Sequence, residues 1–364
     1  MKKILVINPG STSTKIAFYH DGEQVWKESI EHDAAEIKKY AVIYDQKEMR
    51  TELVLQALAD HGEKISELSG VVARGGLLPS YTDPESGAVT TVASGAYEVT
   101  PALIEALRDR PVNHHASNLG CAIAYGIAQQ AGVKAYIYDP VTVDELIDLV
   151  RITGLKDVRR VGQAHNLNMR AAAMKVCREK WIDYYGSNIV VAHLGGGITM
   201  SLHSNGCIVD IVSDDEGPFS PERAGLIPDY LMVRKIEKDK LDYNGAMKLL
   251  QRHGGLTSFF GSSDTRVVEK MAEDGDRESQ LVYEAMALGV ARGMARLAVL
   301  VRGKGDYFVL TGGIAYSEVF CEMVKGYAGF LGEFVIVPGE NEMQALADGC
   351  LRVLGGEETA HIYG

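Results

Sequence analysis

The chain carries two copies of one strand–turn–strand pattern, and this repeat limits its fold more than any other feature. The first copy, Ile4–Tyr19, reads ILVINPGSTSTKIAFY, and the second, Ile189–Val209, reads IVVAHLGGGITMSLHSNGCIV. In each, a short apolar strand enters a glycine-bearing polar turn, a second strand follows, and an Asp-Gly or Asn-Gly pair closes a hairpin. The copies are offset by 185 residues, far more than the period of a solenoid. The repeat therefore predicts two domains of one fold, each presenting a hairpin turn to a cleft between them.

The first turn offers groups that suit phosphate oxygens. Ser11 to Thr14 supply four hydroxyls, the turn supplies backbone N–H groups, and Lys15 adds a positive charge. A P-loop is excluded, because that motif ends in Gly-Lys-Ser/Thr and opens a helix, whereas Lys15 leads into the strand-like run IAFY. The alternative to a phosphate site is a solvated hairpin, because Ser, Asn and Gly favour turns for purely local reasons.

A third loop strengthens the case for a nucleotide. Thr311-Gly312-Gly313 follows the buried run Tyr307–Leu310 and precedes a predicted helix at Ser317–Phe330. A strand, a Gly-Gly pair and a helix start in this order bring backbone amides to an anion. Together with the two hairpin turns, this loop predicts a nucleotide-binding cleft.

Composition bounds the class of protein. A length of 364 residues suggests two or three domains, and a net charge of −12 argues against a nucleic-acid partner but not against small anionic substrates. No apolar run approaches the roughly 18–20 residues needed to span a bilayer. Asn8 and Pro9 end the first apolar run too early for a signal peptide. The five cysteines form no Cys-x-x-Cys pair, which predicts reduced, buried thiols of a cytoplasmic protein.

The order of the predicted elements is βββαβα, twice, which indicates a mixed α/β protein. Three strands open the chain, with the third at Gln24–Ile30, and 77–96 is predicted to be a loop or flap. The other predicted strands are Val71–Ala73, Ala135–Tyr138, 307–310 and 333–337, and a linker is expected near 145–165. Helical patterns cover 34–61, Pro101–Arg108, Leu119–Ala131, 166–183, 229–253, 264–303, 317–330 and 341–354.

The motifs INPGSTSTK, AHLGGG and TGG together resemble those of the acetate/butyrate kinase family, within the sugar kinase–Hsp70–actin superfamily. INPGSTSTK is similar to the butyrate kinase branch, since acetate kinases typically have INAGSSSLK. The resemblance extends over essentially the whole chain. It implies a duplicated ribonuclease-H-like fold of the actin/Hsp70 ATPase type, with two domains around a nucleotide cleft. The first would comprise residues 1–146 plus a returning 340–364, and the second, nucleotide-binding domain residues 147–339.

The resemblance also implies an activity. MgATP would phosphorylate a short-chain fatty acid such as butyrate, reversibly and by direct in-line attack, giving an acyl phosphate and ADP in a homo-oligomeric enzyme. Branched-chain fatty acid kinase and acetate/propionate kinase are alternatives within the class. An Hsp70/actin-type nucleotide switch is the alternative from another class, but the chain shows no appended peptide-binding domain. A phosphatase on the same fold would need basic stretches to track a polyanion, and none is present.

The same resemblance assigns the nucleotide-binding residues by motif. The first motif would bind the phosphates and the water of Mg²⁺. The second motif would bring its glycine backbone close to a phosphate, and the Gly-Gly pair of the third motif would form the nucleoside loop. The residues are, in turn, Asn8, Ser11, Ser13 and Lys15; His193, Gly195, Gly196 and Gly197; and Gly312 and Gly313. The family has Asn within its glycine run where this chain has Gly196.

Two histidines are predicted to be catalytic by resemblance. His165 in GQAHNLN would donate to the transferring phosphoryl group, and the alternative is a surface histidine beside a helix start. His114 in VNHHASN matches the family's active-site histidine, with Asn118 nearby, and His115 is an equal candidate.

Two carboxylates are predicted at the metal, with Asn8 beside them. Asp139 ends a buried strand, where α/β sheets place their active-site acids. Glu342 in PGENEMQALA resembles the family's C-terminal acid, and Glu340 competes with it. Mg²⁺ takes one or two carboxylates with phosphates and water, which suits such a pair. A turn-forming Asp before Pro140 and a first-turn helix Glu are the alternatives.

Two arginines are predicted to clamp the carboxylate and the phosphoryl group, because this task needs a planar, permanently charged side chain. Arg74 in VVARGG stands where the family has His, and Arg223 in PFSPERAGL is inserted relative to the family pattern. Both lie in Gly/Pro-bearing loops, so a solvated arginine is the alternative at each position.

Overall fold

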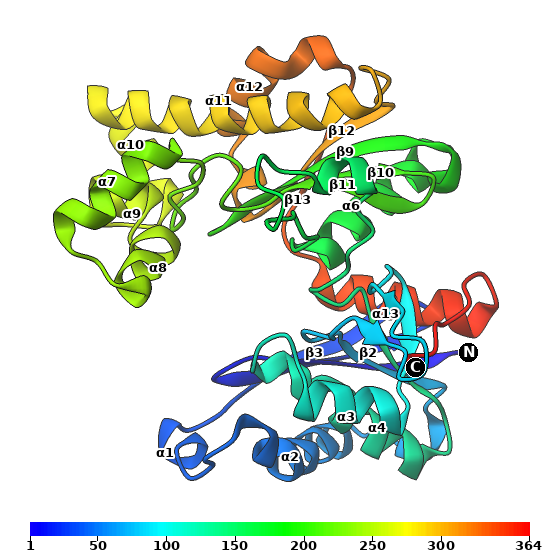
Figure 1. The fold of residues 1–364 in the computed structure, drawn as a ribbon. Coiled ribbons are helices and arrows are strands. Elements are labelled where there is room, and N and C mark those ends of the chain that lie inside the picture. The colour runs from blue at the N-terminus through cyan, green and yellow to red at the C-terminus, as the bar shows by residue number, and fades with distance from the viewer. The chain divides into compact units, whose positions relative to one another are not determined.

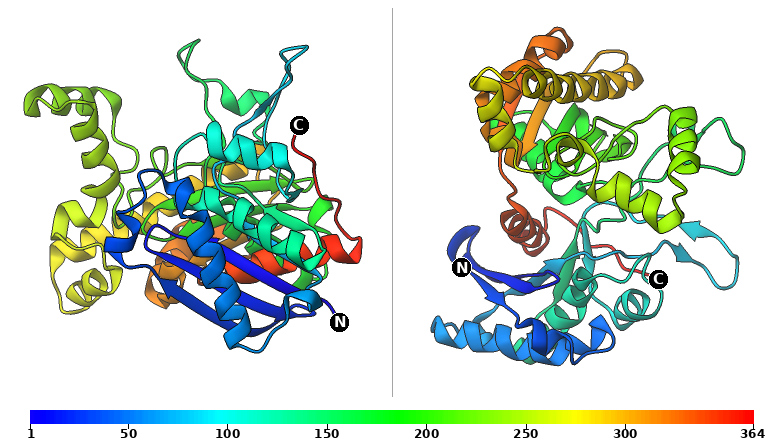
Figure 2. Two further views of the ribbon diagram at one scale, coloured as in Figure 1. Left: turned by 90° about the horizontal axis from the view of Figure 1, so that it is seen from below. Right: turned by 90° about the vertical axis from the view of Figure 1, so that its left-hand side faces the viewer.

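The structure is a computed structural model that describes every residue from Met1 to Gly364. The chain forms two compact units, drawn in Figures 1 and 2. Unit 1 comprises Met1–Glu145 together with Asn341–Gly364, and unit 2 comprises Leu146–Glu340. The C-terminal segment therefore packs in the unit that contains the N-terminus.

A six-stranded sheet lies at the centre of unit 1. Its strands are β1 (Lys3–Pro9), β2 (Ser13–His20), β3 (Glu23–Glu31), β4 (Gly70–Arg74), β7 (Ala96–Glu98) and β8 (Ala135–Tyr138). They are ordered β3-β2-β1-β4-β8-β7. The first three are antiparallel neighbours, β4 and β8 run parallel to β1, and β7 closes the edge antiparallel to β8.

Unit 2 repeats this sheet. Its strands are β9 (Asn188–Leu194), β10 (Ile198–Ser204), β11 (Cys207–Val212), β12 (Tyr307–Gly312) and β13 (Phe334–Pro338), ordered β11-β10-β9-β12-β13. The order and strand directions match β3-β2-β1-β4-β8. Both ends of β9 lie 185 residues beyond the ends of β1, which is the offset of the sequence repeat. The predicted duplicated fold is confirmed.

Helices cover both faces of the sheet in unit 1. They are α1 (Ala34–Ile37), α2 (Lys47–Asp60), α3 (Pro101–Asp109), α4 (Leu119–Ala131) and α13 (Glu342–Gly355). Figure 1 shows α13 on one face and α2, α3 and α4 on the other. Local sequence fixes several ends: Thr100 caps α3 ahead of a proline at its first turn, and Gly132 ends α4 in the left-handed conformation.

The helices of unit 2 are more numerous. They are α5 (Asp148–Arg151), α6 (Asn166–Glu179), α7 (Asp229–Asp239), α8 (Tyr243–Arg252), α9 (Gly255–Phe260), α10 (Thr265–Glu273), α11 (Arg277–Leu300) and α12 (Glu318–Ala328). Helices α6 and α11 lie on opposite faces of the sheet (Figure 1). The apolar core joins the inner side chains of β9, β10 and β12 to α11 and α12.

Several predicted elements differ in detail. The helix expected over 264–303 is broken by Gly275, whose φ of 96° stops α10, and Asp276 caps α11. The helix expected over 229–253 is divided at Lys240, which takes a left-handed φ of 52°. The segment 77–96 contains a small hairpin of β5 (Tyr81–Thr82) and β6 (Val89–Thr90). Four cysteines are buried and free, but Cys207 is exposed, so the prediction that all five are buried is wrong.

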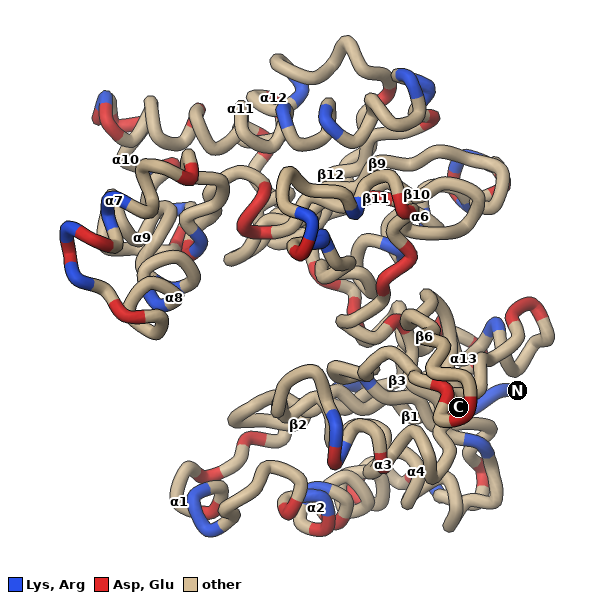
Figure 3. The backbone as a smooth tube through the Cα atoms, in the orientation of Figure 1, with Lys and Arg blue, Asp and Glu red and all other residues tan.

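Charged residues of both signs occur throughout the chain. Basic and acidic positions are interspersed in both units in the view of Figure 3. None of the helices combines the length and the apolar character that a membrane crossing requires.

Candidate active site

Three predicted residues of unit 1 lie in one row across the sheet. Asn8 of β1 and Lys15 of β2 are register partners, so both side chains project from the same face. The Asn8 amide donates to Glu342 Oε2 at 3.0 Å, and Arg74, at the end of β4, forms an ion pair with Glu342 Oε1. Lys15 is exposed and makes no ion pair. Glu342, in the first turn of α13, therefore joins the ends of β1 and β4.

The first turn is tighter than expected. Gly10 N donates to Ser13 O at 2.7 Å, and Ser11 is exposed while Ser13 is half-buried. Thr14 lies within β2 and is fully buried, with its hydroxyl 2.8 Å from His32 Nε2. The prediction that four hydroxyls face a ligand is therefore wrong for Thr14, because strand β2 begins one residue before it.

Asp139 follows β8 directly and is buried in a strained backbone conformation. Its φ is 40°, and its Oδ1 accepts from Gly95 N at 2.7 Å. Tyr138, just before it, is the register partner of Arg74, so Asp139 lies at the same sheet edge as the Arg74–Glu342 pair. Non-glycine residues in this conformation cost about 1–3 kcal/mol and concentrate at functional sites.

The donor set of unit 1 fits Mg²⁺ only with help from a substrate. No group of three or more His, Cys, Asp or Glu side chains is gathered for a metal. The Glu342 carboxylate accepts a hydrogen bond from the Asn8 amide nitrogen, so the two side chains are adjacent. Carboxylate and amide oxygens, which these two side chains carry, are ligands that Mg²⁺ accepts. Phosphates and water would have to complete the coordination, as is usual for Mg²⁺ bound with a nucleotide.

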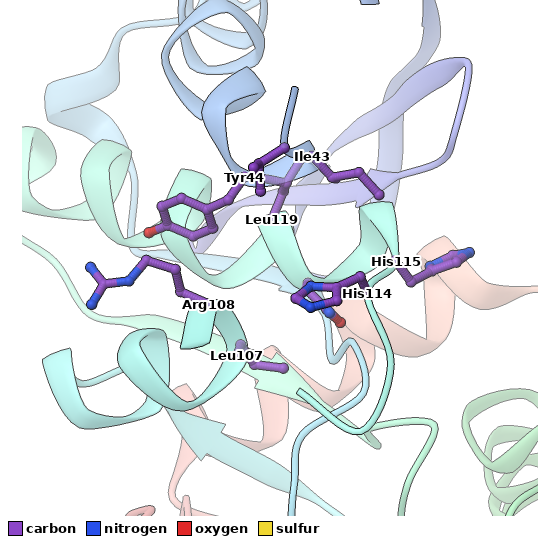
Figure 4. A pocket seen from close by; sticks show the side chains of 9 residues that line it. Ile43, Tyr44, Leu107, Arg108, His114, His115 and Leu119 are labelled. Atoms are coloured by element: carbon purple, nitrogen blue, oxygen red, sulfur yellow. The ribbon is translucent and has the colours of Figure 1, made fainter. Parts of the chain in front are cut away.

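The two adjacent histidines of unit 1 have different surroundings. His115 Nδ1 accepts from Ser117 N at 3.2 Å and caps a short 3₁₀ turn, while His114 makes no hydrogen bond. Partial burial, and then the charge of Arg74, lower the pKa of His115. Figure 4 shows the His114 ring directed toward Arg108, and the His115 ring directed away from it.

Both histidines line a small hollow that is open to solvent (Figure 4). Its other walls are mostly apolar and come from the segments before α2, at the end of α3 and at the start of α4: Val42, Ile43, Tyr44, Leu107, Arg108, Asn118 and Leu119. Arg108 forms an ion pair with Asp109, and Asn118 Oδ1 accepts a hydrogen bond from Leu77 N. The apolar side chains and His114 therefore line the interior of the hollow. These walls had no signal in the sequence.

In unit 2, the two predicted histidines are in contact. The rings of His165 and His193 stack with centroids 4.0 Å apart and planes 14° apart. His165 Nδ1 lies 2.9 Å from Thr199 Oγ1, and its side chain does not cap α6. His165 thus lies beside the helix start and is half-buried, and its side chain is held by Thr199 and His193.

Asn168 fixes the orientation of His193, and sequence reasoning missed it. Its amide lies 2.9 Å from His193 Nδ1 and also donates to Thr311 Oγ1 at 3.3 Å. With Nδ1 accepting, His193 Nε2 carries the proton and lies 3.4 Å from Glu340 Oε1. The only sequence signal was the spacing of three residues between His165 and Asn168, which places both on one side of α6.

The competing acids Glu340 and Glu342 have separate roles in the structure. Glu340 is the last residue of unit 2 and lies beside His193, whereas Glu342 belongs to unit 1. Each acid therefore contacts a predicted site residue of its own unit.

The glycine run after β9 is closely packed at only one position. A Cβ on Gly195 would lie 2.9 Å from His193 Nε2, whereas one on Gly196 would meet the Glu222 carboxylate at 3.6 Å. Gly197 lies against His165 and Arg223. The chain thus has room for a side chain at Gly196, where the family has Asn.

Arg223 is not a solvated loop arginine. Its Nε donates to Asp214 Oδ2 at 3.0 Å, and its Nη1 lies 3.4 Å from Glu222 Oε2 and donates to the Gln251 carbonyl. Its side chain is 29% exposed, so the guanidinium would have to exchange some of these partners to bind a substrate.

Gly312 and Gly313 differ sharply. Gly312 has a φ of 93°, and a Cβ there would lie 2.5 Å from Leu194 O, so the ends of β12 and β9 approach too closely for any side chain. Gly313 has open space around its Cα.

Comparison with known proteins identifies the family. The model of the acetokinase family matches residues 150–335. A relative from Caldanaerobacter subterraneus subsp. tengcongensis, described as "Probable butyrate kinase 2", is 40% identical over 365 residues, covering 100% of both chains.

Solved structures agree on the fold. Acetate kinase from Porphyromonas gingivalis superposes with a TM-score of 0.77 at 19% identity, covering 96% of this chain and 99% of its own. A propionate kinase from Francisella tularensis subsp. tularensis superposes with a TM-score of 0.73 at 15% identity, covering 95% and 98%. The resemblance seen in the three sequence motifs is confirmed, and the chain belongs to the acetokinase family.

Proposed function

We propose that this protein transfers the γ-phosphoryl group of MgATP to a short-chain fatty acid, with butyrate preferred, and so forms an acyl phosphate and ADP reversibly. The observation that carries the proposal is the full-length 40% identity to a protein described as a probable butyrate kinase. The acetate and propionate kinases of similar fold support a carboxylate as the acceptor.

Unit 1 supplies the residues for phosphate and carboxylate. We assign Lys15, Asn8 and the turn at Ser11 and Ser13 to phosphate oxygens, and Glu342, Asp139 and Asn8 to the metal. Bound Mg²⁺ would neutralise part of the phosphate charge. Arg74, now paired with Glu342, would then exchange that partner for the carboxylate of the fatty acid. His114 would lie beside the acid, with His115 as the alternative.

Unit 2 supplies the residues for nucleotide and transferring group. We assign Gly195 to Gly197 with His193 to the phosphates, and Gly312 and Gly313 to the nucleoside. His165, held by Thr199 and stacked on His193, would donate a hydrogen bond to the transferring phosphoryl group. Arg223 would stabilise the same charge after leaving Asp214.

Transfer is proposed to be direct. The carboxylate attacks the γ-phosphorus in line, so no residue needs to carry the phosphoryl group. Trapping a phosphorylated side chain on the wild-type protein during steady turnover would contradict direct transfer.

We propose that the open hollow beside His114 receives the acyl chain. Its apolar walls suit an alkyl group, and its opening to solvent gives a substrate access to them. One methylene is worth only about 1–3 kcal/mol in such a site, so neighbouring chain lengths should also react.

The test offers formate, acetate, propionate, butyrate, isobutyrate and valerate in turn, with MgATP, and traps acyl phosphate with hydroxylamine. We expect acyl hydroxamate to peak at four carbons. A peak at acetate or isobutyrate would move the substrate to the acetate/propionate or branched-chain alternative. ADP release without hydroxamate from any acid would overturn the kinase proposal in favour of a nucleotide switch or phosphatase.

Two further expectations stay predictions. The free cysteines support a reducing compartment such as the cytoplasm. A homo-oligomer is expected from the family resemblance, and light scattering of the purified protein would measure its mass.

A further inference from the structure

Arg50 of α2 is a fully buried arginine that lies behind the first turn. Its Nη1 donates to Gly10 O at 2.9 Å and to Ser13 O at 3.2 Å, and its Nη2 lies 3.4 Å from Ser11 O. Its side chain has no exposed surface. One guanidinium therefore contacts three carbonyls of the first turn.

No carboxylate compensates this charge. The remaining partners of Arg50 are the hydroxyl of Thr14 at 3.0 Å and the side-chain oxygen of Gln46, which accepts from Nε at 3.1 Å and from Nη2 at 2.8 Å. Burying a cation is costly unless an anion or many hydrogen bonds offset the loss of water. Burial lowers the pKa of Arg50 to about 10, so the side chain stays charged near neutral pH.

The contacts of Arg50 also orient the peptide planes of the turn. In a planar trans peptide, the carbonyl and the next N–H point in opposite directions. The carbonyls of Gly10 and Ser11 face the guanidinium, so the N–H groups of Ser11 and Thr12 point away from it. Both residues are exposed, and neither amide donates to another backbone group. Adjacent outward amides of this kind form an anion-binding nest.

Behind the turn, hydrogen bonds connect Arg50 to Thr14 and Thr14 to His32. Thr14 Oγ1 accepts from Arg50 and lies 2.8 Å from His32 Nε2. Burial, and then the charge of Arg50, lower the pKa of His32. A neutral His32 accepts the Thr14 hydroxyl hydrogen at Nε2, which leaves the Thr14 oxygen free to accept from Arg50. Arg50 is thus a buried positive charge on the inner side of the turn.

We propose that Arg50 is a positioning residue for a bound phosphate group: it holds the Ser11 and Thr12 amides outward and adds a buried positive charge behind them. The choice of a nucleotide's terminal phosphate as the ligand rests on the proposed function. The role of Arg50 applies to any phosphate chain, and tripolyphosphate therefore serves as the probe.

The experiment measures binding to the full-length protein by calorimetry, with tripolyphosphate, ATP and adenosine as separate probes. We expect Arg50→Gln to weaken tripolyphosphate and ATP binding by about tenfold or more while adenosine binding is unchanged. Arg50→Lys keeps the charge but lacks the planar fork, so we expect a smaller loss. Arg266→Gln removes an equal charge from an 88%-exposed side chain and should bind all three probes as the wild type does.

The outcomes are distinct. Equal binding of tripolyphosphate by Arg50→Gln and the wild type would overturn the proposal, as would a parallel loss of adenosine binding, which a merely structural role predicts. Failure of the wild type to bind tripolyphosphate would overturn it too. If Arg50→Gln does not fold, Arg50→Lys decides: weaker tripolyphosphate binding with intact adenosine binding supports the proposal, and wild-type binding contradicts it.

Kinetics separate this inference from the proposed function. In an active enzyme, Arg50→Lys should raise KM for ATP and leave KM for butyrate unchanged. A wild type that forms no acyl phosphate would defeat the proposed function, yet the tripolyphosphate comparison would still decide the role of Arg50.

Discussion

The ring of His165 stacks on that of His193 with centroids 4.0 Å apart. One ring comes from the start of α6 and the other from β9, so the second copy of the repeated hairpin directly supports the residue proposed to contact the transferring group.

His165→Ala should slow the phosphoryl-transfer step. Removing a donor to the developing charge costs about 10²–10³-fold in kcat, with a smaller effect on KM for either substrate. Hydroxamate formation at saturating ATP and butyrate measures kcat. The exposed His253→Ala should match the wild type, and a His165→Ala variant with unchanged kcat would remove His165 from the mechanism.

Asn168→Leu should disturb His193 without touching a substrate. The variant loses the amide 2.9 Å from His193 Nδ1, so the ring loses its fixed tautomer. We expect about tenfold lower kcat/KM, by analogy with partners that orient metal-bound or catalytic histidines. Nitrogen NMR of the imidazole is the check: a single Nε2-protonated tautomer in the wild type should become a mixture, and an unchanged tautomer would refute the role.

The two glycines after β12 should differ in their effect on stability. Gly312→Ala forces a Cβ to within 2.5 Å of Leu194 O at a left-handed φ, whereas Gly313→Ala enters open space. Strain of this kind costs about 1–3 kcal/mol or more, so Gly312→Ala should lower the free energy of unfolding measurably. Urea unfolding of both variants tests the contrast, which disappears if the two curves coincide.

Glu342→Gln should raise the Mg²⁺ requirement of the enzyme. The Glu342 carboxylate contacts Asn8 through one oxygen and Arg74 through the other. Its loss removes an anionic oxygen ligand of the proposed metal site. We expect the Mg²⁺ concentration at half-maximal rate to rise about tenfold or more. Glu340→Gln should change it less, and the reverse order would assign the metal to Glu340.

Acid should destabilise unit 2 through His203. Burial, with a contribution from Arg170, lowers the pKa of His203 to about 3, and its ring nitrogens lie 2.9 Å from Tyr184 Oη and 2.8 Å from Ser201 Oγ. An unfolded histidine has a pKa of about 6.5, so the unfolded state binds a proton that the folded state refuses. The contribution of neutral His203 to the free energy of unfolding is complete above the unfolded pKa of about 6.5. It is lost as the pH falls from there toward 3, by ~1.4 kcal/mol per pH unit.

Urea unfolding near neutral pH and near pH 5 measures this loss. His203→Gln keeps hydrogen-bonding groups but does not titrate, so its stability should fall less between the two conditions than that of the wild type. His253→Asn, at an exposed position, should retain the full loss. The buried His32 acts in the same direction, so part of the loss should remain in His203→Gln.

Features that repeat or are local in sequence could be predicted. The offset of 185 residues follows from two similar hairpins, and it matches β1 and β9 at both ends. The bounds of α4 and β8 agree with the predicted ranges because Gly132 and the Asp139-Pro140 pair are strong end signals. The break at Gly275 was missed because apolar periodicity continues on both sides of it.

The contacts that define the candidate site are long-range, and no local pattern contains them. Arg50 reads as an ordinary surface arginine on a helix, and only the packing of α2 behind the first turn reveals its burial. Glu340 and Glu342 are two residues apart, and the division of the chain into units places them in different surroundings. Asn168 contacts His193 and Thr311, which come together only because β9 and β12 pair.

The most direct test of the proposed activity is phosphorus NMR of a mixture of the protein, MgATP and butyrate without a trapping agent. The account predicts an acyl phosphate resonance that grows in equal amount to ADP and reverses when excess ADP is added. Release of inorganic phosphate alone, unaffected by butyrate, would contradict it.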